Sequence, residues 1–190
     1  MILIVLAFVA VATVPLTGGC LREMGSLPIR WMPLAWLAIG LQTVLVSTPW
    51  TPSASAAETL HLSSYAVAAV FAVANWTTPG IPLITVGGAL NLVAIVANGG
   101  VMPASASALS RAGIEEGVEF SNSDFVANAK LQVLGDIFAV PAAWPLSNVF
   151  SIGDILVIVG IGYLAHRQCR PVAADVEQPA VAEHQSGLGA

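Results

Sequence analysis

Five long apolar segments, separated by polar stretches, limit the folds open to this chain. They are residues 2–16, 31–47, 60–76, 81–97 and 152–165. A helix that crosses a lipid bilayer needs roughly 20 apolar residues, and these segments come near that length. The chain is 56% hydrophobic and 9% charged, and its mean hydropathy of +0.82 is far above that of soluble proteins. We therefore expect an all-α integral membrane protein with a bundle of about five transmembrane helices.

Two regions lie outside the predicted helices. Residues 168–190 are rich in proline and small residues, cannot bury enough apolar surface to offset chain entropy, and are expected to form a disordered tail after a membrane domain of residues 1–167. Residues 100–150 form a long connection whose second half is apolar but contains the helix-breaking Pro141 and Pro145. That half is expected either to lie as a helix in the membrane interface or to form a re-entrant hairpin against the bundle.

Basic residues near the helix ends predict the orientation, because Lys and Arg are retained on the cytoplasmic side of a membrane. Arg22 and Arg30 lie in the first connection, and Arg167 and Arg170 follow the last helix. An odd number of spans places these two regions on the same side. The expected localisation is therefore the cell membrane, multi-pass, with the N-terminus and residues 100–150 outside and the tail in the cytoplasm.

The composition also limits partners and cofactors. Cys20 and Cys169 are expected to be free thiols, because both fall on the predicted cytoplasmic side. No metal site and no cofactor are expected, because zinc-type ligand spacings, a P-loop and a dinucleotide motif are all missing from the sequence. The net charge of -5 argues against nucleic acid as a partner. The expected partners are the lipid bilayer, a lipid-like or small-molecule ligand, and a membrane protein.

The segment from residue 87 to residue 100, GGALNLVAIVANGG, places two asparagines inside an apolar run. A helix aligns Gly87, Asn91, Ala94 and Asn98 in one stripe of small and polar side chains, which must face protein. Asn91 and Asn98 either form hydrogen bonds across a helix interface or line a polar ligand site at its outer end. The glycines expected to permit close helix packing are Gly87, Gly88, Gly99 and Gly100.

Two acids stand in similar local contexts, Asp136 in LGDI and Asp154 in IGDI. Asp154 belongs to the run SIGD, which has the form of a capping box at the start of the last helix, where a negative charge also suits the helix dipole. The sequence offers no such structural explanation for Asp136. Because acids at a membrane edge are candidate functional groups, Asp136 is the strongest single candidate site residue.

Several runs together resemble a known family. GGALNLVAIVANGGVMPAS, LGDIFAVP and FSIGDILVIVGIGYL, with the turn at Gly18 and Gly19, resemble an uncharacterised bacterial family of small multi-pass membrane proteins classed as a domain of unknown function. The resemblance covers nearly the whole chain before the tail. It implies the same five-span fold and no particular activity.

A second resemblance is local. The run WPLSNVFSIGD at residues 144–154 is similar to the last catalytic motif of lipoprotein signal peptidases, in which an asparagine and then an aspartate precede the final span. This resemblance implies that Asp154 is one of two catalytic aspartates. The second aspartate of that family should closely follow the asparagine at position 91, and no acid stands there. Asp136 would have to replace it from a non-equivalent position.

Two classes of function follow, with a third as the alternative. In the first, a binding or accessory protein holds a small or lipid-like ligand at the extracytoplasmic face through Asn91, Asn98 and Asp136. In the second, an intramembrane aspartyl-type hydrolase uses Asp136 and Asp154, which share a proton about a water. In the third, the chain is a purely structural membrane subunit. The sequence favours the first, non-enzymatic class.

Overall fold

The computed structural model describes residues 2–47, 54–114, 123–125 and 128–169. Within these ranges the chain is mostly helical, with a few short strands. The α-helices are α1 (Ile2–Ala12), α2 (Met32–Ser47), α3 (Ala54–Ala74), α4 (Ile81–Ala97), α5 (Ala106–Ala112) and α6 (Ile152–Gln168). The 3-10 helices are η1 (Val14–Thr17), η2 (Leu21–Ser26) and η3 (Gln132–Leu134). The strands are β1 (Met102–Ala104), β2 (Ser123–Phe125), β3 (Phe138–Val140) and β4 (Asn148–Phe150).

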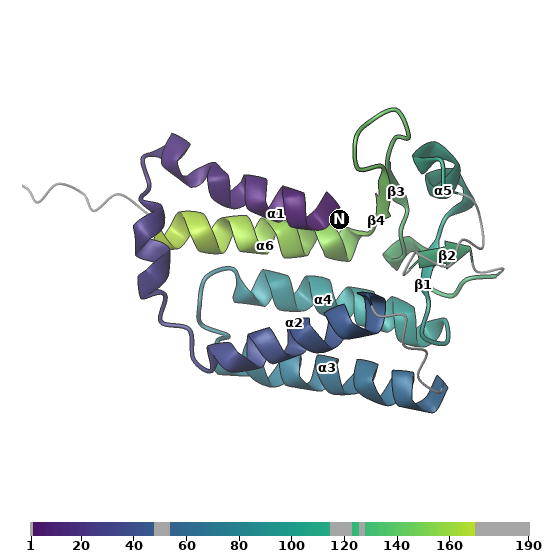
Figure 1. The fold of residues 1–190 in the computed structure, drawn as a ribbon, viewed down its shortest axis with the longest axis horizontal. Helices are drawn as coiled ribbons and strands as arrows, with labels where there is room; N and C mark the ends of the chain where they lie inside the picture. The colour runs from purple at the N-terminus through teal and green to yellow at the C-terminus, as the bar shows by residue number, and fades with distance from the viewer. Residues whose placement is uncertain (1, 48–53, 115–122, 126–127, 170–190) are drawn as a thin grey trace, which may run out of the picture.

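The bundle consists of α1, α2, α3, α4 and α6 (Figure 1). Helices α2, α3, α4 and α6 alternate in direction, and α1 runs parallel to its neighbour α6. Helix α6 packs between α1 and α4, and α2 packs against α3. One end of the bundle, the turn end, holds η2, the turn between α3 and α4, and the last turn of α6. The opposite end, the strand end, holds the first turn of α6 together with the strands and α5.

The five predicted helical segments are present, and their ends differ from the prediction. Helix α4 has the predicted bounds, and α2 begins one residue late. Helix α3 begins at Ala54, ahead of the predicted residue 60, and α6 continues to Gln168, beyond the predicted residue 165. Helix α1 ends at Ala12, before the predicted residue 16, because Pro15 lacks a backbone N–H and the chain continues as η1.

Helix length and polarity correct the expected transmembrane spans. Among the residues that the structure describes, no helix is both long enough and apolar enough to cross a membrane. Helix α1 has 11 residues, α2 has 16, and α4 and α6 have 17 each, whereas a crossing takes roughly 20. Helix α3 has 21 residues, but Glu58 and His61 lie in its first half.

The prediction of an all-α fold is wrong for the described part of residues 100–150. Strand β1 pairs in parallel with β2, and β3 pairs antiparallel with β4, so the apolar second half is a β-hairpin and not the helix expected as one alternative. Pro141 directly follows β3 and Pro145 lies in the connecting loop, so neither proline interrupts the pairing of the strands. Helix α5 packs against both strands of this hairpin through Leu109, Ala112 and Val149. The predicted disordered tail lies almost wholly outside the described residues.

Helices α4 and α6 approach each other most closely at glycines. A Cβ atom on Gly87 would collide with the carbonyl oxygen of Gly153, and a Cβ atom on Gly80 would collide with that of Gly160. Gly80 and Gly87 are seven residues apart, and so are Gly153 and Gly160. Seven residues are about two helical turns, so the two glycines of each segment lie on the same face. Gly80 also has a φ of 91°, which favours glycine. The two main chains therefore approach each other closely at two places about two turns apart.

The other glycines expected at this contact lie elsewhere. A Cβ atom on Gly88, Gly99 or Gly100 would meet nothing within 4 Å. Gly99 and Gly100 have φ angles of 70° and 96°, and the Gly100 N–H donates to the carbonyl oxygen of Ile95 at 2.9 Å. These two glycines therefore end α4 by adopting a left-handed conformation.

Helix α1 and the residues that follow it are attached to α6 through His166. The Nε2 atom of His166 lies 3.0 Å from the Thr13 hydroxyl, and its Nδ1 atom lies 3.1 Å from the Thr17 hydroxyl. Beside these contacts Val14 is fully buried against Ala165. The first connection of the chain is thereby held against the last turn of α6, at the turn end.

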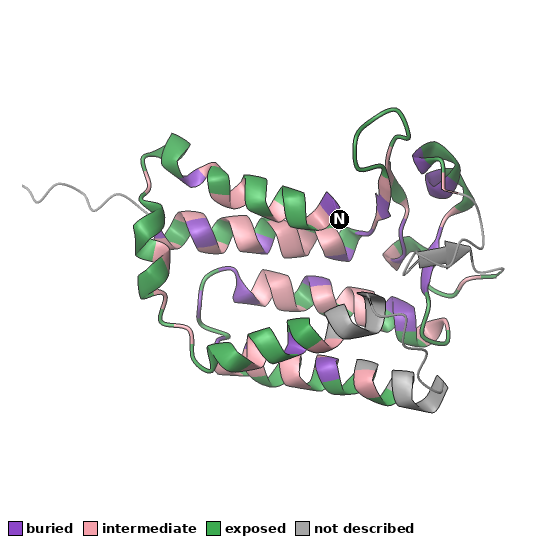
Figure 2. Cartoon of the chain, in the orientation of Figure 1, coloured by how far each residue is buried: buried purple, intermediate pink, exposed green. Residues whose placement is uncertain are grey.

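Much of the outer surface of the bundle is apolar. Phe8 on α1 and Val73 on α3 are 71% and 76% exposed, and only a few of the described residues of each bundle helix are buried (Figure 2). Large exposed apolar side chains also occur on α2, α4 and α6. Large apolar side chains are therefore exposed on each of the five bundle helices.

We predict that Gly87→Ala destabilises the protein by about 1–3 kcal/mol, because the added methyl group must separate α4 from α6. Gly88→Ala is the matched control, since its methyl group enters open space and alanine is better than glycine within a helix by roughly 0.5–1 kcal/mol. Thermal unfolding of both variants in a neutral detergent measures the difference. Equal midpoints for the two variants would contradict the assigned contact.

Candidate functional site

The structure brings Asn91 and Asp154 together at the strand end of the α4–α6 contact. The Asn91 Nδ2 atom donates to Asp154 Oδ1 at 2.8 Å, and the Ser151 hydroxyl donates to Asn91 Oδ1 at 2.8 Å. The absence of a side chain at Gly153 makes room for the Asn91 amide, because a Cβ atom there would collide with its oxygen. Asn91 therefore joins the two helices through hydrogen bonds at both ends of its amide.

The capping box predicted from the sequence at the start of α6 is confirmed. The Ser151 N–H donates to Asp154 Oδ2 at 2.9 Å, and the Asp154 N–H donates to the Ser151 hydroxyl oxygen at 3.0 Å. Together with the bond from Asn91, both carboxylate oxygens of Asp154 accept hydrogen bonds within the protein. This carboxylate stabilises the start of α6 and its attachment to α4.

Asn98 is held in a separate contact with the connection after β2. Its Nδ2 atom donates to the carbonyl oxygens of Ala94 and Lys130, both at 2.8 Å, and its Oδ1 atom accepts from the Lys130 N–H at 2.9 Å. Both amide hydrogens are thus used. Asn98 attaches the main chain of Lys130 to the last turn of α4.

Asp136 lies between η3 and β3 and is 4% exposed. Its N–H donates to the carbonyl oxygen of Pro103 at 2.9 Å, and its carbonyl oxygen accepts from the N–H of Ser105 at 3.0 Å. The main chain of Asp136 therefore continues the pairing of β1 at Ala104. The four polar candidates thus occupy three places: Asn91 with Asp154, Asn98 at Lys130, and Asp136 beside β1.

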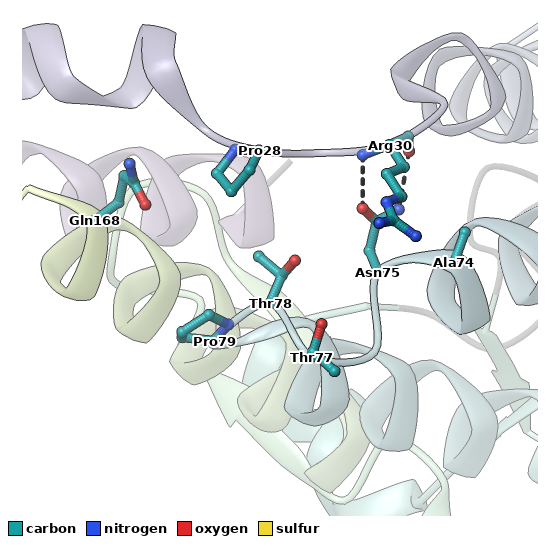
Figure 3. Close-up of a pocket in the computed structure, with 8 residues that line it drawn as sticks. All are labelled: Pro28, Arg30, Ala74, Asn75, Thr77, Thr78, Pro79 and Gln168. Atoms are coloured by element: carbon teal, nitrogen blue, oxygen red, sulfur yellow. Dashed lines mark hydrogen bonds between the residues drawn. The ribbon is translucent and has the colours of Figure 1, made fainter.

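A polar pocket with a volume of about 320 Å³ lies at the turn end, far along the bundle from these residues (Figure 3). Its walls come from three segments: the connection before α2, the end of α3 with the following turn, and the end of α6. The lining residues are Pro28, Arg30, Ala74, Asn75, Thr77, Thr78, Pro79 and Gln168. Residues from the first connection and from the turn face each other across the pocket.

Asn75 holds the two sides of this pocket together. Its Oδ1 atom accepts from the Arg30 N–H at 2.7 Å, and its Nδ2 atom donates to the Arg30 carbonyl oxygen at 2.9 Å and to that of Phe71 at 2.8 Å. Asn75 is itself 2% exposed, so these bonds are largely protected from water. The main chain of Arg30 is therefore held against the end of α3.

The Arg30 side chain gives the pocket a positive charge. Its hydrogen bonds to Asn75 use only main-chain atoms of Arg30, and within the described ranges its guanidinium group is not paired with a carboxylate. The remaining polar lining consists of the hydroxyl groups of Thr77 and Thr78 and the amides of Asn75 and Gln168. The pocket thus combines one cation with neutral donors and no acid.

The sequence interpretation does not single out this pocket. It uses Arg30 only as evidence of orientation, and it gives no role to Asn75 or Thr78. The signal present in the sequence is the polar run NWTTPG between two apolar helices, together with an arginine in the preceding polar connection. Arg30 and Asn75 stand 45 residues apart, so only the packing of the helices shows that they meet.

The two thiols near the turn end differ in their surroundings. Cys20 is exposed, Cys169 is buried, and both are free, as the sequence predicts. Burial raises the pKa of the Cys169 thiol above its ordinary value, and the nearby Cys20 and Glu23 raise it further, while a main-chain hydrogen bond at Met24 opposes them. Less Cys169 is therefore present as the reactive thiolate near neutral pH.

We predict that a maleimide reagent modifies Cys20 rapidly at pH 7 and Cys169 slowly. Because the pKa of Cys169 is raised, its rate should continue to increase above the ordinary thiol pKa of about 8.5. Mass spectrometry of the protein at several times and pH values measures both rates, and the variant Cys20→Ser should show the slow reaction alone. A fast reaction of this variant at pH 7 would contradict the burial of Cys169.

Comparison with known proteins gives a family and no function. Residues 26–165 match the profile of DUF5317, a family of unknown function, and this range contains the α4–α6 contact and all pocket residues except Gln168. An uncharacterized protein of Thermotoga maritima is 30% identical over 118 residues, which cover 62% of this chain and 66% of that protein, just under two thirds. No solved structure matches. The resemblance to lipoprotein signal peptidases stays a hypothesis.

Proposed function

We propose that this chain, which belongs to the DUF5317 family of unknown function, is a lipid-associated binding or accessory protein whose ligand occupies the pocket at the turn end. The observation that carries the proposal is the pocket itself, in which an arginine without a carboxylate partner among the described residues is held beside neutral hydrogen-bond donors. Sites of this kind combine a concave shape with a few convergent polar groups.

The apolar outer surface supports the lipid-associated part of the proposal. Trp31, just before α2, and Trp76, just after α3, are 61% and 51% exposed at the turn end. Trp144 is exposed in the hairpin loop at the strand end. Tryptophans at two levels of an apolar bundle are typical of the two interfaces of a bilayer. Helices shorter than the usual hydrocarbon thickness are accommodated where the bilayer thins.

The pocket is a better-supported site than the outer-face site expected from the sequence. Asn91 and Asn98 each bond through both ends of their amides to other parts of the protein. Asp136 is buried beside β1. The two asparagine side chains are used for structure and Asp136 is shielded by burial, whereas the Arg30 side chain is exposed at the pocket and has the capacity to bind a ligand.

The geometry favours the binding role over the two alternatives, an aspartyl-type hydrolase and a purely structural subunit. For an aspartyl-type hydrolase, Asp154 would have to exchange a proton, yet both of its oxygens already accept hydrogen bonds from Asn91 and Ser151. A purely structural subunit agrees with the roles of the asparagines. It offers no reason for a pocket that exposes an arginine side chain.

The sidedness expected from the basic residues is part of the proposal and can be tested with thiols. Ser107, which is exposed on α5 at the strand end, is changed to cysteine in a Cys20→Ser background. We predict that an impermeant maleimide modifies Ser107→Cys on intact cells and modifies native Cys20 only after lysis. Modification of native Cys20 but not of Ser107→Cys on intact cells would show that the orientation is the opposite one. Equal modification of the two thiols on intact cells would exclude a bilayer-crossing arrangement.

A pocket-blocking variant tests the binding role. Ala74→Trp places a large side chain in the pocket, whereas Ala69→Trp places one on the exposed surface of the same helix. We predict that native mass spectrometry of protein released from detergent shows a bound small molecule or lipid on the wild-type chain and on Ala69→Trp, and loses it on Ala74→Trp. The same adduct on all three proteins would exclude the pocket as the site.

A further inference from the structure

We propose that the pocket at the turn end recognises a phosphate group, an inference that rests on the proposed function and assigns a chemical class to its ligand. Arg30 is the centre of this recognition. Its guanidinium group is planar, permanently charged and able to donate two parallel hydrogen bonds to one oxyanion. Because Asn75 holds only the main chain of Arg30, these side-chain donors remain available to a ligand.

The other donors reach the pocket from different directions. Thr77 and Thr78 belong to the turn between α3 and α4, and Gln168 belongs to the last turn of α6 (Figure 3). Arg30 approaches from the connection before α2, on the opposite side from the turn. A tetrahedral phosphate presents three or four acceptor oxygens in different directions, whereas a carboxylate presents two in one plane. The arrangement of donors therefore fits phosphate better than carboxylate.

The charges at this end of the bundle favour an anion. Arg22 in η2 and Arg167 in α6 lie at the turn end with Arg30, and Glu23 is the acid that the described residues place there. Asp136, just before β3, and Asp154, in the first turn of α6, lie at the strand end. An excess of one sign of charge around a concave site raises the local concentration of ions of the opposite sign.

The neighbours of the pocket indicate where the phosphate comes from. Exposed Trp31 follows Arg30 in the sequence, and exposed Trp76 follows Asn75. Tryptophan side chains prefer the headgroup level of a bilayer, which is also where lipid phosphates lie. The volume of about 320 Å³ lies at the lower end of small-molecule sites and accommodates a phosphate with a short polar substituent. A phospholipid headgroup and a free phosphate share this chemistry, and the experiment distinguishes them.

The test measures the thermal unfolding midpoint of the full chain in a neutral detergent as each of four probes is added. The probes are inorganic phosphate, acetate at the same ionic strength, dioctanoyl phosphatidylglycerol, and dioctanoylglycerol, which has the same chains without the phosphate. A ligand that binds only the folded protein raises the midpoint, by an amount that increases with the ratio of its free concentration to its Kd. We expect dioctanoyl phosphatidylglycerol to raise the midpoint more than dioctanoylglycerol does, and inorganic phosphate to raise it more than acetate does.

Three variants assign the effect to the pocket. Arg30→Gln should weaken the apparent affinity for the phosphate probes by roughly tenfold or more, because it removes a charged pair of hydrogen bonds. Arg30→Lys keeps the charge and loses the planar pair of donors, so its loss should be smaller. Arg167→Gln removes a cation from the same end without altering the pocket lining and should bind nearly as the wild type does. Both Arg30 variants retain the main-chain bonds to Asn75 and should fold.

The outcomes separate this inference from the proposed function. If phosphatidylglycerol binds and inorganic phosphate does not, the source is a lipid headgroup; the reverse result identifies a free phosphate. If dioctanoylglycerol or acetate binds as well as its phosphate counterpart, or if Arg30→Gln and Arg167→Gln lose affinity equally, phosphate recognition is overturned while a binding role for the pocket stands. If no probe shifts the midpoint of the wild-type chain, the phosphate assignment fails; the proposed function fails separately if Ala74→Trp retains the adduct.

Discussion

Where α4 lies against α6, two pairs of glycines allow the main chains to approach closely, and the hydrogen bonds of Asn91 to Asp154 and Ser151 depend on this approach. Gly87 faces Gly153, and Gly80 faces Gly160 two turns further along. At one end of the contact the Asn91 amide reaches the start of α6, and at the other end α6 reaches the turn that lines the pocket. A side chain at any of these glycines would separate both ends at once.

Asparagines make the other connections in a chain with few charges. Asn75 holds the connection before α2, Asn91 holds the start of α6, and Asn98 holds the connection that contains Lys130. Each amide both donates and accepts, so it can satisfy main-chain or side-chain groups of another segment without introducing a charge. In surroundings with little water such bonds stabilise one arrangement of the helices. Polar residues in apolar helices are therefore insufficient evidence of a ligand site by themselves.

The pocket differs from these contacts in one respect. Its asparagine is bonded on all sides, whereas its arginine side chain has no carboxylate partner among the residues that the structure describes. Because its main chain is held by Asn75, the Arg30 side chain starts from a fixed point beside the pocket, which removes the main-chain part of the entropic cost of binding. The exposed tryptophans beside it, Trp31 and Trp76, place this cation at the edge of the apolar surface.

The sequence by itself determined the features that depend on neighbouring residues: the five helical segments and the capping box of Ser151 and Asp154. Periodicity and capping act within a few residues, so they can be read directly. Only the tertiary structure decided which glycines meet, that the proline-containing segment forms a β-hairpin, and that Arg30 meets Asn75. The glycine contacts and the contact of Arg30 with Asn75 join residues 45 or more positions apart. The hairpin is one of several conformations open to its segment, and packing selects it.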